Sequence, residues 1–375
     1  MFITTELLFK TLLYVFGSVT FIQILYFLFF YFRVIFWKSK KTETVNIQPV
    51  SIIIAARNEA ENLKKNLPYF LEQDYPDFRV IVVNDASTDD SETILAELKL
   101  KYKNLYVTNI PFDEKFRHGK KTALTIGIKA AETDILLFSD ADCKPAGKNW
   151  VKSISQNFDE KKQFVIGFGG YEKSKGLINK FVRNDTVFIA LTYLGFALAK
   201  MPYMGVGRNM AYRKSYFLEK KGFARQMNLL SGSDDLFINQ NATRRNLSVE
   251  LSNESFTFSE TKKTFKQWKN QKSRHLTTGK YYKFKHKFLL FLEPFSRLIY
   301  YALGIFLMSV NQYLVIVSSI FVFRFLFFCF ILYKSNKKFE QKGLFISGIF
   351  FDILQPFFNL YFSLFARKKN ELIWK

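Results

Sequence analysis

The chain has 375 residues, of which 49% are hydrophobic, and it carries a formal charge of +23 with only two cysteines. So few cysteines exclude a disulfide-rich secreted fold. The apolar residues gather toward the two ends, which favours membrane segments over one large core, and the charge suits an anionic lipid surface or a phosphorylated substrate as well as a nucleic acid.

An apolar segment lies near the start of the chain. Residues 11–32 contain no charged side chain, and as a helix they would be roughly 33 Å long, enough to cross a bilayer. Arg33, Lys38 and further lysines follow, so this end is predicted to face the cytoplasm. We predict a transmembrane anchor over residues 8–36. A cleaved signal peptide is the alternative, but no small-residue cleavage site follows.

Residues 46–260 alternate strand-like and helix-like segments. The strand-like segments are 50–56, 79–84, 105–110, 135–139 and 164–171. The helix-like segments lie near 59–73, 90–103, 119–131 and 147–160. This order predicts an α/β fold with a mostly parallel sheet and helices on both of its faces.

The strand at 135–139 ends abruptly in two carboxylates, Asp140 and Asp142. Open α/β sheets bind ligands at the carboxyl ends of their strands. Two hard oxygen ligands at this place suit Mg²⁺ or Mn²⁺ bound to a substrate diphosphate.

Two other strands are predicted to deliver polar groups to the same edge. The first runs into Asn58 and Glu59, and the second runs into Asp85. Ser87 and Asp89 follow, and for these two residues we give helix capping and ligand binding about equal odds. Three acidic strand ends in one crevice are costly unless a cation or donor joins them, so we interpret the edge as a binding site.

A short motif, His118-Gly119-Lys120-Lys121, precedes the predicted helix at 119–131. A glycine turn with a lysine at a helix start favours an anion, although a solvated lysine pair is the common alternative. We interpret His118 as a neighbour of the site rather than a metal ligand, since no second ligand lies at metal-binding spacing.

Two later motifs have both a structural and a functional interpretation. The glycines of Gly205-Val206-Gly207-Arg208-Asn209-Met210 either form a plain turn or let the backbone approach a sugar. Asp234 and Asp235 open a helix-like run at 236–245. One acid is expected to cap that helix, and the other is a candidate general base.

A basic segment, 261–287, follows the α/β region, and its residues 262–287 hold ten Lys/Arg and no Asp/Glu. We predict that it lies on anionic lipid. Single-stranded nucleic acid is the alternative, but the neighbouring apolar segments favour lipid. Gln271 and Arg274 would share one helix face, and Arg suits a bidentate grip on phosphate.

Residues 288–367 are predicted to form two to three transmembrane helices, near 288–310, 313–333 and 344–366. Their charged residues should face other helices or the interface; these are Glu293, Arg297, Arg324 and Asp352. Three full crossings would place the basic end, Arg367-Lys368-Lys369 and the tail 368–375, outside, against the positive-inside rule. The alternative is an interfacial or re-entrant segment around Pro356.

Taken in order, these motifs resemble the membrane-bound family-two glycosyltransferases, which include the cellulose, chitin and hyaluronan synthases. The resemblance covers roughly residues 48–280. It implies the A-type glycosyltransferase fold flanked by transmembrane helices, and a UDP- or GDP-linked sugar as donor.

The resemblance also implies roles for single residues. Asp142 would be the direct metal ligand with Asp140 beside it, Asp235 the general base, and Asp85 the residue that recognises the nucleotide base. The further donor contacts would be Ala56, Asn58, Glu59, Asp140, Lys120 and Arg274. The acceptor or sugar contacts would be Gly207, Arg208, Asn209, Asp234 and Gln271.

Besides the opening motif, where Ala56-Arg57-Asn58-Glu59 stands in place of the Tyr-Asn-Glu of many members, two positions depart from the family pattern. Asp234 stands where the family has Glu, and His275 stands where the processive synthases have the Trp of the Q-x-x-R-W motif. The second departure, together with the small membrane part, favours transfer of a single sugar over chain extension.

The expected function is inverting, metal-dependent transfer of a sugar from a nucleotide sugar to a hydroxyl of a lipid or glycan acceptor. The protein is expected in the cell membrane as a multi-pass protein, in contact with its lipids, with the catalytic domain cytoplasmic and with no nucleic-acid partner. The alternatives are a processive polysaccharide synthase that exports its chain and a non-catalytic membrane protein that binds nucleotide sugars.

Overall fold

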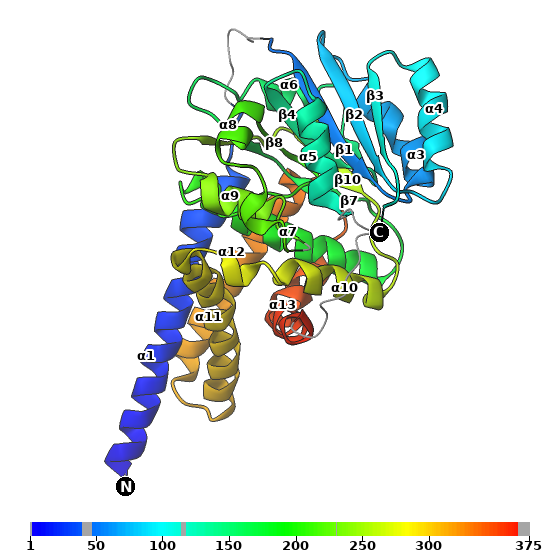
Figure 1. Ribbon diagram of the computed structural model, residues 1–375. Coiled ribbons are helices and arrows are strands. Elements are labelled where there is room, and N and C mark those ends of the chain that lie inside the picture. The colour runs from blue at the N-terminus through cyan, green and yellow to red at the C-terminus, as the bar shows by residue number, and fades with distance from the viewer. Residues whose placement is uncertain (1, 40–46, 114–117, 230, 367–375) are drawn as a thin grey trace.

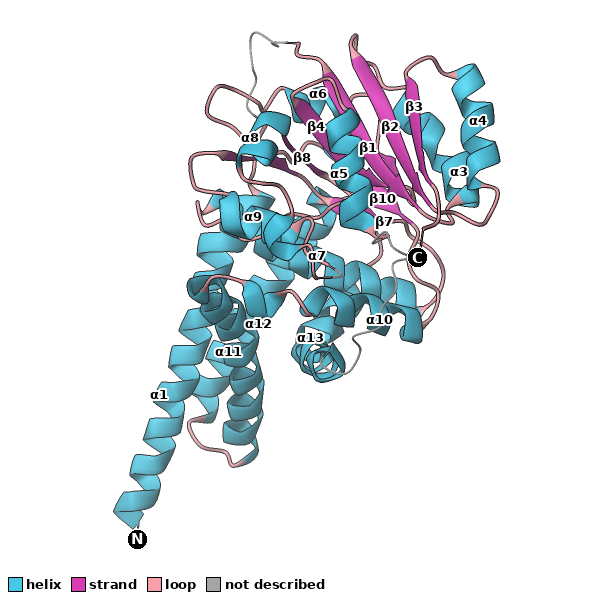
Figure 2. Ribbon diagram, in the orientation of Figure 1, coloured by secondary structure: helices cyan, strands magenta, loops and turns pink. Residues whose placement is uncertain are grey.

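The computed structural model describes residues 2–39, 47–113, 118–229 and 231–366 (Figure 1). An α/β domain sits at one end, and long helices project from its underside (Figure 2). The predicted tail 368–375 lies outside the described residues.

The main sheet has seven strands in the order β3-β2-β1-β4-β8-β6-β9. They span β1 Val50–Ala56, β2 Phe78–Asp85, β3 Leu105–Ile110, β4 Ile135–Asp140, β6 Phe164–Ile166, β8 Met210–Arg213 and β9 Leu247–Val249. All strand pairs are parallel except the two that β8 makes with β4 and β6. The central strand β1 is buried along its whole length, as expected for an apolar run covered on both faces.

Helices cover both faces of the sheet, as predicted. Ile52 and Ile54 of β1 belong to one core, which they share with α3 (Ala60–Leu71), α4 (Ser91–Lys101) and α6 (Trp150–Ser155). Ile53 and Ala55 point to the opposite core, which they share with α5 (Lys120–Ala130). Since alternate residues of a strand face opposite sides, one strand serves both layers.

The predicted strand 164–171 is wrong as a single element. It is two strands, β6 in the main sheet and β7 (Gly169–Tyr171) in a second sheet of order β5-β10-β7. The other strands of that sheet are β5 (Cys143–Pro145) and β10 (Thr257–Ser259). The chain bends at Gly167, where a Cβ would lie 2.7 Å from the Asn209 amide nitrogen, so a larger residue would not fit.

Two predicted helices are shorter than expected. The one near 147–160 ends at Ser155, and Asp159 then accepts hydrogen bonds from the backbone N–H groups of Lys161 and Lys162 in a turn. The run at 236–245 is α9 (Asp235–Asn241), after which Asn246 accepts from the Thr243 N–H. Side chains that bond to nearby backbone compete with continued helix. The remaining short elements are α8 Lys214–Glu219 and the 3₁₀ turns Ala224–Gln226, Asn253–Ser255 and Gly279–Tyr281.

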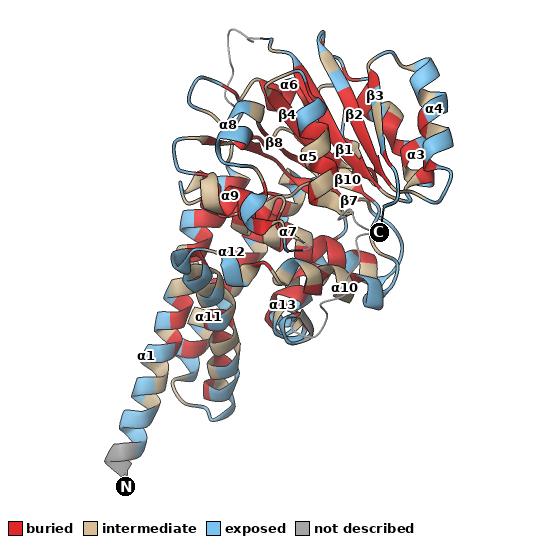
Figure 3. Ribbon diagram, in the orientation of Figure 1, coloured by how far each residue is buried: buried red, intermediate tan, exposed pale blue. Residues whose placement is uncertain are grey.

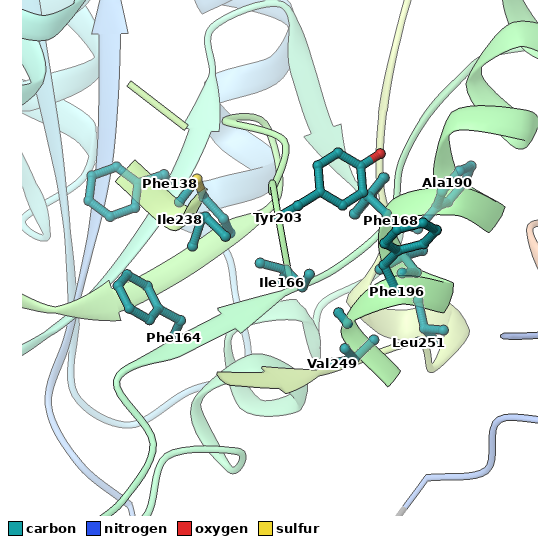
Figure 4. Close-up of a cluster of buried hydrophobic side chains, with 14 of the residues drawn as sticks. Phe138, Phe164, Ile166, Phe168, Ala190, Phe196, Tyr203, Ile238, Val249 and Leu251 are labelled. Carbon is teal, nitrogen blue, oxygen red and sulfur yellow. The ribbon is translucent and has the colours of Figure 1, made fainter. Parts of the chain in front are cut away.

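One long helix, α7 (Leu177–Leu198), was not predicted. It lies beneath the sheet and above the projecting helices (Figure 1). Figure 4 shows Ala190 and Phe196 of this helix beside Ile166 and Phe168 from the β6–β7 region. It therefore joins the core of the α/β domain to the helical part.

Among the described residues, five helices are long and apolar enough to cross a membrane: Thr5–Ile35, α7, α11 (Phe284–Ser309), α12 (Leu314–Lys338) and α13, with its window over Phe345–Leu364. The first comprises α1 (Phe2–Tyr26), a π-helical turn (Phe27–Tyr31) and α2 (Phe32–Ile35). The apolar window of α7 is 72% buried, whereas those of the others are 22–33% buried, and Figure 3 shows their exposed outer faces. The predicted turn between α11 and α12 is present, with Asn311 and Tyr313 at positive φ.

Candidate active site

The carboxyl ends of β1, β2 and β4 meet at one edge of the sheet. In the register of the strands, Ala55 is paired with Asp140 and Ala56 with Asn84. The structure therefore brings the three predicted polar strand ends together. Ala56 itself is fully buried, so any contact that it makes with a ligand is through its backbone.

The acidic pair, Asp140 and Asp142, lies at the centre of this edge. Their carboxylate oxygens and the Cys143 sulfur lie within 4.8 Å of one another. Burial and the neighbouring Asp140 raise the pKa of Asp142. Burial opposes ionisation of Asp140 as well, but the Lys120 ammonium, which forms an ion pair with it, lowers its pKa. The charge of Asp140 is thus offset by an ion pair, whereas that of Asp142 is offset only in part.

Glu59 adds a third acid to this region. Burial raises its pKa, and the charges of Asp142 and Asp140 contribute to the shift. The nearest cation to Asp142 among the described residues is Lys262, whose Nζ lies 3.9 Å from Oδ2. Carboxylate oxygens that repel one another fit a hard divalent cation. The Cys143 thiol is a poor ligand here, since burial raises its pKa well above the usual value.

The loops after β1 and β2 are tied together by their own polar side chains. The Asn58 side-chain oxygen accepts from the Thr88 N–H at 2.8 Å, and the Asn58 backbone N–H donates to the Ser87 hydroxyl. Asp89 accepts from the N–H groups of Ala60 and Ser91, at the starts of α3 and α4. Asp89 thus bonds to the starts of two helices, as a capping residue does, whereas Ser87 bonds to Asn58 and Asn84 within the loops.

Asp85 is fully buried at the end of β2. One of its oxygens lies 2.6 Å from His118 Nδ1, and the other accepts from the Gly119 N–H at 3.0 Å. His118 therefore lies beside an acid of the site, as predicted for a neighbour. This contact also fixes the turn that precedes α5 and hence the place of Lys120.

Asp234 and Asp235 face different surroundings. Asp234 accepts from the Gly207 N–H at 2.9 Å, and its charge acts on Lys120, which also binds Asp140. Asp235 is buried, and its Oδ2 accepts from the hydroxyls of Thr278 and of Tyr282, the latter at 2.7 Å. Asp234 is therefore the acid on the side of the acidic pair.

The predicted helix cap at this place is not formed in the expected way. Asp234 occupies the position before α9 but its side chain makes no capping bond. The backbone N–H that donates to the Asp235 side chain is that of the next residue, Leu236. Burial and the charge of Asp234 raise the pKa of Asp235 to about 6.

In the loop before β8, Asn209 is buried and Arg208 is half-buried. Asn209 is fully buried; its amide donates to the carbonyls of Phe168 and Ser255, and its oxygen accepts from the Trp150 indole. The prediction that Asn209 contacts a sugar is therefore wrong, because all of its polar atoms are used inside the protein. Arg208 is half-buried, and the central carbon of its guanidinium lies 4.4 Å from the centre of the Tyr171 ring.

Gly207 lies where the loop passes both Asp234 and Lys120. A Cβ at this position would be 3.3 Å from an Asp234 oxygen and 3.5 Å from Lys120 Nζ. Glycine here lets the backbone N–H reach Asp234.

The helix α10 (Phe265–Leu276) carries Gln271 and Arg274. Gln271 donates to the Tyr171 hydroxyl at 3.0 Å, under the Arg208 guanidinium. The charge of Arg274 acts on both Lys120 and Asp140. The structure thus places the predicted basic groups around the acidic pair.

Three residues of this region were not predicted from the sequence: Tyr171, Thr278 and Tyr282. Each acts through a hydroxyl group and none stands in a recognisable motif. Thr278 and Tyr282 do lie just after the Q-x-x-R-like motif, which was the one available signal.

The chain was compared with known proteins. The sequence model described as glycosyl transferase family 2 matches residues 51–219, and the one described as glycosyl transferase family group 2 matches residues 148–334. The poly-beta-1,6-N-acetyl-D-glucosamine synthase of Staphylococcus epidermidis is 31% identical over 102 residues, 27% of this chain and 24% of that protein. The probable glycosyltransferase YdaM of Bacillus subtilis is 29% identical over 197 residues, 50% of this chain and 44% of that protein. The chain thus spans less than half the length of these relatives.

Among solved structures, the mannosyltransferase PcManGT of Pyrobaculum calidifontis, in complex with GDP-Man and Mn²⁺, has a TM-score of 0.61 at 15% identity. The match covers 96% of this chain and all of that one. It confirms the predicted fold class, a mostly parallel sheet of the A-type glycosyltransferase fold with long apolar helices.

Proposed function

The chain belongs to glycosyl transferase family 2, and we propose that it transfers a sugar from a nucleoside-diphosphate sugar to a lipid or glycan acceptor, with inversion, at the cytoplasmic face of a membrane. The observation that carries this proposal is the acidic pair at the carboxyl edge of the sheet, ringed by Lys120, Arg208 and Arg274. Carboxylates for a metal and cations for a diphosphate are both needed by such a donor. The solved structure with this fold holds a nucleotide sugar and Mn²⁺, which supports the same donor class.

Asp142, with Asp140 beside it, is the best candidate to hold Mg²⁺ or Mn²⁺. When bound, such an ion would offset the negative charge of the donor diphosphate. Asp142 is the more available ligand of the two, since Asp140 already forms an ion pair with Lys120. The hard oxygen donors fit either ion.

The cations have distinct places around the diphosphate. Lys120 stands at the start of α5 and bridges toward both Asp140 and Asp234. Arg274 reaches the same region from α10. As charge develops on the leaving nucleoside diphosphate, these groups would stabilise it without reorganising. The position of Asp85 at the end of β2 supports a role in binding the nucleotide base, with Asn58 and Glu59 on the adjoining strand end.

We assign the role of proton acceptor to Asp234, although the family pattern favours Asp235. Asp234 faces the acidic pair across Lys120 and is held by the Gly207 N–H. Asp235 accepts from three donors and is buried. Asp234 would take the proton of the acceptor hydroxyl as that oxygen attacks the anomeric carbon and the nucleoside diphosphate leaves from the opposite face. Arg208 and Gln271 line the same wall and would contact the sugar or acceptor.

The experiment is a nucleotide-sugar panel tested on the purified full chain with Mn²⁺. A true donor should raise the thermal midpoint by mass action and should then be consumed when a lipid extract is supplied as acceptor. If no UDP- or GDP-sugar raises the midpoint and none is hydrolysed or transferred, the proposal is wrong and a non-catalytic role takes its place.

A processive polysaccharide synthase is the second candidate. It is favoured by the Staphylococcus relative, which is named as a synthase of a poly-glucosamine. His275 in place of Trp argues for single transfer. Product length from radiolabelled donor distinguishes the two, since one added sugar per acceptor excludes processive extension.

A further inference from the structure

We propose that Lys262 makes the binding of the divalent cation and the binding of the donor diphosphate depend on each other. Its ammonium group offsets the charge of Asp142 before the cation binds, and it turns to the phosphates of the donor once Asp142 holds the cation. This role rests on the proposed function, because it takes a metal and a nucleoside diphosphate as ligands of the crevice. The sequence placed Lys262 in the basic segment predicted to lie on lipid, whereas the structure places its ammonium at the acidic pair.

The contact between Lys262 and Asp142 is an ion pair without a hydrogen bond. The Lys262 Nζ is 3.9 Å from Asp142 Oδ2, which is too long for a hydrogen bond, so the pair depends on charge alone. The Lys120 ammonium, in contrast, donates a hydrogen bond to Asp140. Of the two lysines at the acidic pair, Lys262 is therefore the one that is more easily displaced.

The charge of Lys262 acts on two acids of the crevice. Burial and the neighbouring Asp140 raise the pKa of Asp142, and the charge of Lys262 opposes that rise. Burial also raises the pKa of Glu59, and Lys262 again acts in the opposite direction. Lys262 and a divalent cation at Asp142 would thus offset the same negative charge. Since like charges repel, each of them weakens the binding of the other.

The backbone on both sides of Lys262 is fixed, whereas its side chain is not. The strand β10 ends at Ser259, which is paired with Cys143, the residue after the acidic pair. The Thr261 hydroxyl accepts from the amide of buried Asn179 at 3.1 Å, and two residues after Lys262 a capping box begins α10. The Lys262 side chain is 42% exposed, and a lysine stem has four flexible carbons. The ammonium can therefore move by bond rotation while its backbone stays beside the crevice.

Such a lysine couples the two ligands of the crevice. Without a donor, the Lys262 ammonium competes with Mg²⁺ or Mn²⁺ for Asp142, so the metal is expected to bind weakly on its own. With a donor, the same ammonium has phosphate oxygens to contact, and a charge-assisted hydrogen bond to phosphate is a strong one. Because coupling between two binding sites is reciprocal, the metal must strengthen donor binding by the same factor. The crevice would then take up the metal and the donor together.

The experiment measures the affinity of the purified full chain for Mn²⁺ and for UDP, with GDP as the second nucleotide. Free Mn²⁺ is followed by electron paramagnetic resonance, with and without nucleotide. Lys262→Met removes the charge and keeps most of the length of the side chain. Without nucleotide, this variant should bind Mn²⁺ about three- to tenfold more tightly than the wild type, because a repelling charge is gone.

The same variant should bind nucleotide less well, but only when the metal is present. At saturating Mn²⁺, Lys262→Met should bind UDP about tenfold more weakly, because a phosphate contact is lost. Without metal, the affinity for UDP should stay nearly the same, since Lys262 is then at Asp142. The factor by which UDP strengthens Mn²⁺ binding should therefore fall about tenfold.

Two control variants separate the charge at Asp142 from the net charge of the protein. Lys263→Met removes the same charge from the next residue, which is exposed, and should leave these affinities within about a factor of two. Lys262→Arg restores a positive charge and should recover most of the coupling. Unchanged Mn²⁺ affinity in Lys262→Met, or an equal change in Lys263→Met, would overturn the role of Lys262.

The results also separate this role from the proposed function. If the wild type binds Mn²⁺ and a nucleotide, and Lys262→Met binds both equally well, the proposed function stands and Lys262 is an ordinary solvated lysine. If the wild type binds neither Mn²⁺ nor either nucleotide, the proposed function is wrong and the role of Lys262 is wrong with it. None of these measurements depends on sugar transfer.

Discussion

Two groups of charged residues in this molecule have similar compositions and opposite arrangements. In the charge cluster of the helices, Asp352 bonds to Arg297, Arg324 and the Tyr301 hydroxyl, and Arg297 also bonds to Glu293. In the crevice, Asp142 and Glu59 have raised pKa values because burial and neighbouring acids are not fully offset. The first network pairs two acids with two arginines, so its charges balance, whereas the second lacks positive charge that a ligand would bring. The difference separates charges that hold helices together from charges that await a substrate.

The largest expected effect is on turnover when the uncompensated acid is removed. Asp142→Ala should lower sugar transfer by about 10³-fold or more and abolish the Mn²⁺-dependent thermal shift with donor. The thermal midpoint without ligand should not fall, because the substitution removes a carboxylate that its neighbours disfavour. Transfer assays and melting curves check both. If Asp142→Ala lowers the thermal midpoint but leaves the rate of sugar transfer unchanged, Asp142 has a structural role and does not bind the metal.

Removing an acid of the balanced network should act on stability. Asp352→Ala leaves Arg297 and Arg324 without their shared partner and should cost about 3–5 kcal/mol of unfolding free energy. Unfolding in detergent measures it, with Phe350→Ala on the exposed face of the same helix as control. Equal melting of the two variants would show that the network contributes nothing.

The two adjacent acids of the crevice should differ in kind. Asp234→Asn should lower transfer by about 10² to 10⁴-fold while sparing donor binding. Asp235→Asn keeps groups that can bond to Thr278 and Tyr282 and should retain most of the activity. If Asp235→Asn is the inactive one and Asp234→Asn transfers normally, the base is Asp235.

The raised pKa of Asp235 predicts a pH dependence of stability. Between about pH 4 and 6 the folded chain keeps a proton on Asp235 that the unfolded chain has lost, so the unfolding free energy falls as pH rises. With a folded pKa of about 6, the loss is at most about 3 kcal/mol. Asp235→Asn should flatten this part of the curve of unfolding free energy against pH relative to the wild type. Asp142 and Glu59 are present in both proteins, so their contributions cancel in the comparison. Parallel curves for the two proteins would refute the shift.

The smallest effect is expected at a crevice residue with a structural role. Asp89→Ala removes the acceptor for the N–H groups of Ala60 and Ser91 and should cost about 1 kcal/mol. Donor affinity should stay within a factor of two. A loss of donor affinity much larger than a factor of two would show that Asp89 contacts the donor.

Much of the fold was predictable because it is encoded locally. The runs that became β1, β2 and β4 are continuously apolar, and parallel strands must bring their carboxyl ends together, so Asp85, Asp140 and Asp142 followed from the sequence. The helix α7 could not be predicted from the sequence, because Arg183 and Asp185 interrupt its apolar pattern. Their partners, Gln341 and Lys272, come from distant parts of the chain.

The site residues that the sequence did not predict correctly are also determined by contacts between distant parts of the chain. Asn209 looked like a sugar contact because it follows two glycines and an arginine, yet Trp150, Phe168 and Ser255 use its polar atoms. The different surroundings of Asp234 and Asp235 depend on Thr278 and Tyr282, more than forty residues away in sequence. No local pattern reports such contacts.

The packing of α10 against α13 has a consequence for how an acceptor arrives. Since α10 carries Arg274 on the crevice side and Trp268 on the α13 side, only about one helix diameter, roughly 10 Å, separates the crevice from α13. At the membrane face proposed for the transfer, a headgroup hydroxyl would span such a gap without leaving its leaflet. A lipid-linked acceptor would then find the crevice by lateral diffusion, a two-dimensional search in which the surface density of the lipid, rather than its bulk concentration, sets the encounter rate.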